Sequence, residues 1–355
     1  MKVDGPTSWR YLRSMRSDPP GRASSGARRK TFSAALQQGE ELWQAAASVS
    51  PAVSPLTLFY GLSQAGRAIA AAQIEAKDTW QTVPGHGLIL PKPEIAVETL
   101  PSLNDVYVFD NGDAYFQQIT RLLGSPSLQK PGASIAALCC SLPEPEQWED
   151  TWSLVRPLRI STSQGGPGAF VNLPAVEARV SPVPEHLIPE SEYATPHEPE
   201  HLPILEDVIS LLQPYPTLLL PNPPTKVSGA QRLIPGITRA AGVTLSWNVE
   251  EELSFGDRKL WCMNHLMSYS EPYVGNWPES GWALPAIGNN HAPMHPLATW
   301  WAILYGMSML ARYHPRIWTM LLDLDRSREA VAVHSILDAA RDEVPYLLLR
   351  QLGGF

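Results

Sequence analysis

The chain has 355 residues, of which 44% are hydrophobic, and this is enough apolar material to bury a sizeable core. Its formal net charge of −8 at pH 7 excludes a molecule that binds polyanions over its whole surface. The three cysteines, two of them adjacent, fit neither a disulfide framework nor the ligand spacing of a metal site. The cysteine pattern therefore predicts no metal site, and no cofactor is expected.

The first 30 residues differ in charge from the rest of the chain, because they hold eight Lys and Arg residues and only two acidic ones. The stretch RSDPPGRASSGARRK is rich in Pro, Gly and Ser, so residues 1–30 are expected to form a disordered basic tail. Clustered cations bind phosphates, which suggests RNA as a partner. A tail that only aids solubility is the alternative. The segment lacks the apolar region of a secretory signal, and a cytoplasmic location is expected.

The remaining chain, 31–355, is predicted to be a single domain of class α+β that is mainly helical. Helical patterns fill 31–83 and return in 258–355. Between them, residues 84–257 carry short β-like runs divided by Pro and Gly, which predict an irregular, β-rich and loop-rich insert. The N-terminal and C-terminal helices are expected to pack together.

Along the chain, the first clear helical pattern is TFSAALQQGEELWQAAASV, residues 31–49, and Ser54 followed by Pro55 then opens the next helix. The longest apolar run, PLATWWAILYGMSMLA, lies in a helix predicted over 296–313. It is shorter than the roughly 20 residues that a membrane span needs, and it contains Thr, Gly and Ser. A buried helix and no membrane partner are therefore predicted.

Within the insert, apolar runs rich in β-formers predict strands at 105–109, 134–142 and 243–255. The run PTLLLPNPPTK, 216–226, is expected to be a further strand. Residues 160–203 are rich in Pro, Gly and Glu, and this composition predicts loops.

One motif occurs twice, as YGLSQAGR in residues 60–67 and as YGMSMLAR in residues 305–312. On a helix, the Tyr, Ser and Arg of each copy share one face. The Gly in each copy costs about 1 kcal/mol relative to Ala, which favours a close helix–helix approach at Gly61 and Gly306.

If the two helices cross at these faces, Arg67 and Arg312 lie close together. They then share either an internal carboxylate, as a structural pair, or a bound phosphate. His86 and His295 stand in polar segments beside apolar runs, where capping of helix ends is the alternative role. The candidate ligand-binding residues are Tyr60, Ser63, Arg67, His86, Tyr305, Ser308, Arg312 and His295.

Three catalytic patterns are present but weak. Ser63 lies in GLSQA, close to the nucleophile elbow of serine hydrolases, although a continuous helix also explains this stretch. Arg328 and His334, both expected on the last long helix, have the spacing of the helical Arg-to-His motif in ribonucleases of the HEPN class. The sequence HEPEH, residues 197–201, matches H-E-x-x-H, but Pro199 disfavours the helix that a zinc site requires.

The order of these motifs also suggests a family. An amphipathic helix, then SPLTLFYGLSQAGRAI, then GHGL, and finally HPLATWWAILYGMSMLARYHPRIW resembles the YaaC-like bacterial proteins over residues 31–350. This resemblance implies a mainly helical cytoplasmic protein and carries no activity, cofactor or catalytic residue to transfer. The function predicted is a binding module for a protein partner or a phosphate-bearing ligand such as RNA. A HEPN-like ribonuclease or a serine hydrolase remains the alternative, so catalysis stays open.

Overall fold

A computed structural model describes residues 2–75, 80, 85–92, 100–143, 148, 151–162, 173–188, 202–220, 222–231, 240–270 and 280–353. The chain forms two compact units, each with its own core. The helical unit comprises Lys2–Leu154, Ile287–Asn290 and Met294–Phe355, and the sheet unit comprises Val155–Ala286 and His291–Pro293.

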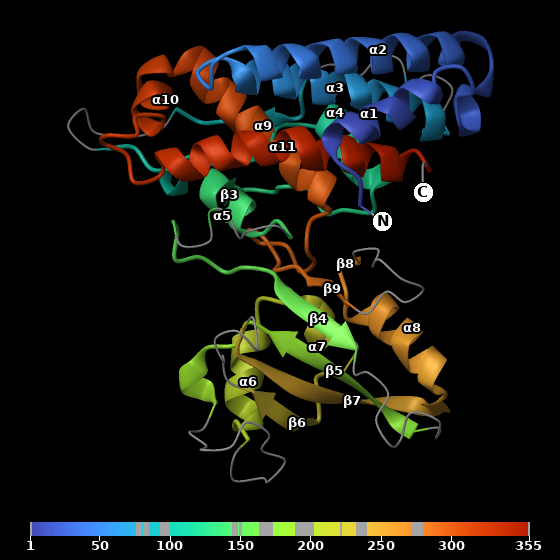
Figure 1. The fold of residues 1–355 in the computed structure, drawn as a ribbon, viewed down its shortest axis with the longest axis vertical. Helices are drawn as coiled ribbons and strands as arrows, with labels where there is room; N and C mark the ends of the chain where they lie inside the picture. Colours follow the sequence, from blue (N-terminus) through green and yellow to red (C-terminus); the bar gives the residue numbers. More distant parts are fainter. Residues whose placement is uncertain are drawn as a thin grey trace. The chain divides into compact units, whose positions relative to one another are not determined.

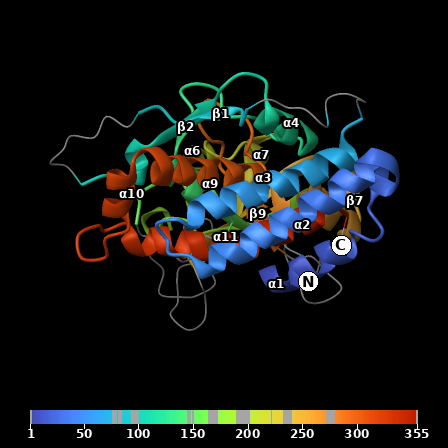
Figure 2. The same ribbon diagram turned by 90° about the horizontal axis from the view of Figure 1, so that it is seen from above.

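The helical unit is built from helices of both ends of the chain (Figure 1). Its helices are α1 (Gly5–Ser14), α2 (Gly26–Ser48), α3 (Ser54–Gln73), α4 (Tyr115–Leu122), α5 (Ile135–Cys140), α9 (Pro296–Tyr313), α10 (Pro315–Leu321) and α11 (Ala330–Gln351). Figure 2 shows α3 lying between α2 on one side and α9 and α4 on the other. Since α11 packs against α1, α3 and α9, the predicted association of N-terminal and C-terminal helices is confirmed.

A small antiparallel sheet completes the helical unit. Its strands are β1 (Leu88–Ile89), β2 (Tyr107–Asp110) and β3 (Ala133–Ser134), in the order β1-β2-β3. The segment predicted as a strand over 134–142 is instead α5, because the Ser134 side chain caps it by accepting a hydrogen bond from the Ala137 amide at 3.1 Å. The predicted insert therefore begins too early, since these elements belong to the helical unit.

The sheet unit contains a six-stranded antiparallel sheet in the order β6-β7-β5-β4-β9-β8. Its strands are β4 (Leu158–Thr162), β5 (Leu173–Ser181), β6 (Lys226–Gln231), β7 (Gly242–Leu253), β8 (Tyr269–Ser270) and β9 (Ser280–Ala283), and its helices are α6 (Leu205–Leu212), α7 (Pro216–Leu219) and α8 (Phe255–His265). The strand predicted at 243–255 is thus confirmed as β7. The run from 216 begins with a helix, in which Pro216 occupies the favoured first turn.

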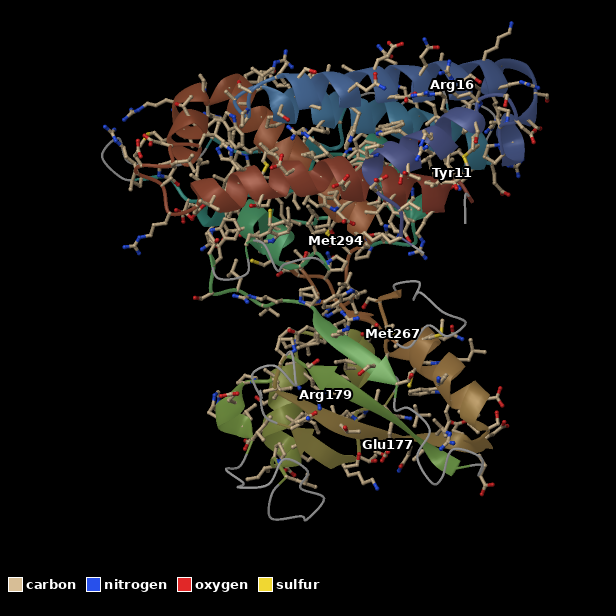
Figure 3. The ribbon with its side chains drawn as sticks, viewed as in Figure 1. Tyr11, Arg16, Glu177, Arg179, Met267 and Met294 are labelled. Carbon is tan, nitrogen blue, oxygen red and sulfur yellow. The ribbon has the colours of Figure 1, made fainter. Side chains whose placement is uncertain are left out.

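The two faces of this sheet differ in polarity. On β5, Val176, Ala178 and Val180 are buried in the core of the unit, whereas Glu177 and Arg179 point to the other face and are half-buried (Figure 3). This alternation is what an antiparallel sheet with one covered face requires. The prediction that residues 160–203 form loops is therefore wrong for the end of β4 and for all of β5, because these residues form strands.

The N-terminal segment is folded rather than a disordered tail. In α1, Trp9 is 6% exposed and Leu12 is fully buried, and the Trp9 ring lies 6.1 Å from that of Trp43 on α2. The Arg13 guanidinium forms an ion pair with Glu40, which raises the pKa of Arg13 through the hydrogen bond and the opposite charge. The Pro-rich and Gly-rich stretch that suggested disorder contains the connection between α1 and α2, with a short 3-10 helix at Gly21–Ser24, and its last residues are the first turn of α2.

Candidate functional site

The two copies of the repeated motif lie inside α3 and α9, and these helices run antiparallel. The Phe59 ring lies 5.5 Å from the Tyr305 ring, whereas a Cβ added to Gly66, two turns later on α3, would touch Trp301, which lies earlier on α9. Contacts therefore move backwards along α9 as they advance along α3. This direction decides which residues of the two copies meet.

The helices do not cross at their Gly residues. A Cβ on Gly61 would lie 2.9 Å from the Trp43 ring and 3.2 Å from the Gly39 carbonyl oxygen, so Gly61 permits the close approach of α3 and α2. A Cβ on Gly306 would lie 2.7 Å from Ile135 and 3.0 Å from Val108. Each Gly thus allows close packing, but with different partners, and the expected crossing of α3 and α9 at these residues is wrong.

The hydroxyl groups of the second copy form hydrogen bonds with backbone carbonyls inside the core. The Tyr305 hydroxyl donates to the Leu88 carbonyl at 2.7 Å, and burial raises the pKa of Tyr305 to about 12. Ser308 is fully buried, and its hydroxyl donates to the Tyr305 carbonyl at 2.7 Å. The geometry therefore gives Tyr305 and Ser308 structural contacts.

The first copy presents its polar side chains at the surface. Tyr60 and Arg67 are exposed, and Ser63 and Gln64 between them are half-buried. These four residues are here called the α3 stripe, because their spacing places them on one face of the helix. Within the described part of the chain, the side chains of Ser63, Gln64 and Arg67 have no hydrogen-bond partner.

One end of the α3 stripe meets the last turn of α9. The Arg312 guanidinium donates a hydrogen bond to the Tyr60 hydroxyl at 3.2 Å, and its carbon lies 4.9 Å from the centre of the Tyr313 ring. Tyr313 is 59% exposed. None of the carboxylates that the structure describes pairs with Arg312, so its positive charge is open to an external anion.

His86 lies beside this end of the stripe. Its ring is 5.2 Å from that of Phe59 and 5.9 Å from that of Tyr305. Burial lowers the pKa of His86, and the positive charge of Arg312 lowers it further. His86 is therefore a neutral neighbour of Arg312 at neutral pH.

A second histidine, His314 at the end of α9, lies near another cation. Burial lowers the pKa of His314, and the charge of Lys92 adds to this effect. Lys92 is exposed and follows the strand β1. Lys92 and Tyr313 were not singled out by the sequence patterns, although Tyr313 directly follows the Arg of the second motif copy.

The expected meeting of Arg67 and Arg312 does not occur. Because α3 and α9 are antiparallel, Arg312 lies beside Tyr60, and Arg67 lies seven residues further along α3. At 1.5 Å per residue this is about 10 Å along the helix axis. Arg67 instead lies near Tyr115 of α4, whose pKa its charge lowers in opposition to the larger effect of burial.

His295 caps a helix. Its Nδ1 atom accepts a hydrogen bond from the Leu297 amide at 3.0 Å at the start of α9, and its own amide donates to the Ser125 hydroxyl at 3.0 Å. Burial lowers the pKa of His295 to about 4, with a smaller contribution from Arg350. Of the two roles considered for His295, the structure therefore shows the capping one.

The residues of the catalytic motifs do not have the geometry that each type of catalysis requires. Ser63 lies in the interior of the continuous helix α3, whereas a nucleophile elbow needs a strand-to-helix turn. Arg328 precedes α11 and only His334 lies on it, so the expected placement of both residues on the last helix is wrong. The motif at residues 197–201 lies outside the described residues.

The cations of the N-terminal segment are largely occupied by internal partners. Arg22 pairs with Glu75 at 2.9 Å, and Arg28 donates to the carbonyls of Ala71 and Ile74, both at 2.9 Å. Arg16, labelled in Figure 3, donates to the Gln37 side chain at 2.6 Å. This segment thus gives the RNA interpretation less support than its composition suggested.

The described residues contain no group of three or more His, Cys, Asp or Glu side chains that could hold a metal ion. No helix within the described part of the chain is both long and apolar enough to cross a membrane.

A family model described as YaaC-like Protein matches residues 7–179 and 201–352. Comparison with curated proteins and with solved structures finds no match.

Proposed function

The chain belongs to the YaaC-like protein family, and from its side chains we propose that it is a binding module for a phosphate-bearing ligand, held by Arg312 at the Tyr60 end of the α3 stripe. The observation that carries this proposal is the exposed guanidinium of Arg312, which contacts the Tyr60 hydroxyl and the Tyr313 ring but no described carboxylate. A guanidinium offers a planar set of donors that fits two phosphate oxygens at once.

The surroundings of Arg312 favour a phosphate over a neutral ligand. Burial is the main cause that lowers the pKa values of His86 and His314, and Arg312 and Lys92 respectively lower them further, so two cations act on the groups at this surface. The exposed rings of Tyr60 and Tyr313 add flat apolar faces, on which a nucleobase can stack. Cations beside exposed tyrosines are typical of surfaces that bind nucleotides or single-stranded RNA.

Binding, rather than catalysis, is supported by what the neighbouring hydroxyls do. Those of Tyr305 and Ser308 donate to backbone carbonyls, and Ser63 lies in a helix with no base in contact with it among the described residues. A nucleophile needs an adjacent base within hydrogen-bond reach.

The test compares Arg312→Gln with Arg326→Gln. Both variants lose one exposed guanidinium of the helical unit, but Arg326 pairs with Asp323, and no contact of Arg326 with the α3 stripe is present among the described residues. Isothermal titration calorimetry with inorganic phosphate and with uridine 5′-monophosphate should show binding that weakens with salt and falls about tenfold in Arg312→Gln, the loss of about 1.4 kcal/mol of binding free energy. The Arg326→Gln variant should match the parent. Equal affinities in all three proteins, or no binding by the parent, would overturn the proposal.

A further inference from the structure

Tyr115 carries a buried hydroxyl without a partner. It is the first residue of α4, it is 8% exposed, and its ring packs edge-on against Trp301 with 5.6 Å between ring centres. The hydroxyl oxygen has no hydrogen bond to any described group. Such an unsatisfied group costs on the order of 1–3 kcal/mol, and most buried polar groups avoid it. Burial raises the pKa of Tyr115 far above its usual value, so the hydroxyl keeps its proton and acts as a donor.

The hydroxyl lies next to the far end of the α3 stripe. A Cβ added to Gly66 would be 3.3 Å from it, which places it against the α3 backbone one residue before Arg67. Arg67 is exposed and makes no hydrogen bond or ion pair within the described part of the chain. An unpaired cation therefore lies near an unpaired donor, and the charge of Arg67 acts on the Tyr115 hydroxyl in opposition to the larger effect of burial.

The half-buried polar residues Ser63 and Gln64 connect this point to Arg312. They occupy the face of α3 between Tyr60 and Arg67, and their side chains have no internal partner among the described residues. Arg312 contacts the stripe at Tyr60, and Arg67 follows about 10 Å further along the helix axis, so the two cations flank one polar helix face.

We propose that Arg67 and Tyr115 form a second phosphate subsite, and that the ligand is a single-stranded oligonucleotide with one phosphate on Arg312 and another on Arg67 and Tyr115. This inference rests on the function proposed above. A flexible single strand carries phosphates at intervals that can span about 10 Å, and its bases can stack on Tyr60 and Tyr313. Arg67 is held by no described group, so its guanidinium can turn towards a phosphate oxygen that reaches the Tyr115 hydroxyl.

The experiment varies ligand length against subsite. Affinities of the full chain for uridine 5′-monophosphate and for oligouridylates of about two, four and six nucleotides are measured by calorimetry at low salt. The parent should bind an oligonucleotide at least about tenfold more tightly than the mononucleotide. Arg67→Gln and Tyr115→Phe should lose this gain and leave the affinity for the mononucleotide unchanged. Arg312→Gln should weaken both.

Tyr115→Phe is the decisive variant, because it removes one oxygen atom and no internal hydrogen bond. Its melting temperature should equal or exceed that of the parent, so weaker oligonucleotide binding would not reflect unfolding. If the parent shows no gain with length, or if both variants keep that gain, the second subsite is wrong while mononucleotide binding through Arg312 stands. If neither ligand binds to the parent, the proposed function and the second subsite both fail.

Discussion

At the scale of single residues, the same letters in the two motif copies have opposite environments. Tyr60 is exposed and accepts a hydrogen bond from Arg312, whereas Tyr305 is buried and donates to a backbone carbonyl. Arg67 and Arg312 are both exposed, yet they stand at opposite ends of the α3 stripe. A residue's role here depends on which helix face its neighbours cover, and the motif does not encode that.

His295 provides a test at this scale, because its capping bond requires an unprotonated Nδ1 atom. Its pKa is about 4 in the folded chain and rises to the usual 6.5 on unfolding, so the unfolded chain binds the extra proton first as the pH falls. The stability that His295 contributes is complete above about pH 6.5 and is lost progressively towards pH 4. His295→Asn keeps a good capping residue and should reduce the loss of unfolding free energy between pH 7 and pH 4 by about 2–3 kcal/mol. Chemical denaturation at both pH values measures this, and parallel pH profiles would contradict it.

At the scale of elements, α3 is positioned by close packing at two glycines and by one contact between aromatic rings. Gly61 allows α2 to approach, Gly66 receives the edge of the Trp301 ring, and Phe59 packs against Tyr305. Another side of the same helix carries the exposed and half-buried residues of the α3 stripe. Packing of α3 against α2, α9, α11 and α4 therefore holds the stripe in a fixed orientation.

Gly66→Ala tests this arrangement. An added Cβ would lie 2.4 and 2.8 Å from two atoms of the fully buried Trp301 ring, and a rigid ring has little room to move. Overpacking of about 1–3 kcal/mol should outweigh the gain of about 1 kcal/mol in helix propensity, so the variant should unfold at lower denaturant concentration. Gly256→Ala, on α8 with nothing within 4 Å of its added Cβ, is the matched control and should be neutral or stabilising. A Gly66→Ala variant as stable as the parent would show that the Trp301 ring can move aside without lowering the free energy of unfolding.

At the scale of the whole molecule, the first helix is part of the helical unit. The Gly5 amide donates to the Asp342 carboxylate at 3.1 Å, and the Trp43 indole beside Trp9 donates to the Arg341 carbonyl at 3.2 Å. These bonds join the two ends of the chain. The helical unit consequently depends on residues whose composition predicted a flexible tail.

Trp9→Ala should therefore destabilise the helical unit by about 3 kcal/mol or more, because it empties a site next to Trp43 in the core. Arg10→Ala, which removes an exposed hydrogen bond to Thr7 and a minor attraction to Asp4, should change the unfolding free energy by less than about 1 kcal/mol. Urea denaturation followed by circular dichroism compares the two variants. If Trp9→Ala unfolds at the same midpoint as Arg10→Ala, α1 contributes no stability.

Local chemistry was sufficient to predict much of this protein from its sequence. The helices α2, α3, α9 and α11 follow from apolar periodicity, and Pro55 and Pro296 mark two of their starts. The mainly helical α+β class and the joining of N-terminal and C-terminal helices also follow, because each apolar face needs a partner. The exposed Tyr60 and Arg67 were candidates from the motif alone.

Only the tertiary structure decided which of these candidates meet. The antiparallel direction of α3 and α9 separates Arg67 from Arg312, and no short-range pattern carries that direction. Tyr115 reaches Gly66 across a long stretch of chain, and Arg312 reaches Tyr60 across 252 residues. Such contacts depend on how whole helices pack, and the energy of packing is shared among many side chains that are distant in the sequence. The periodicity of a helix specifies its faces, and the fold decides what each face contacts.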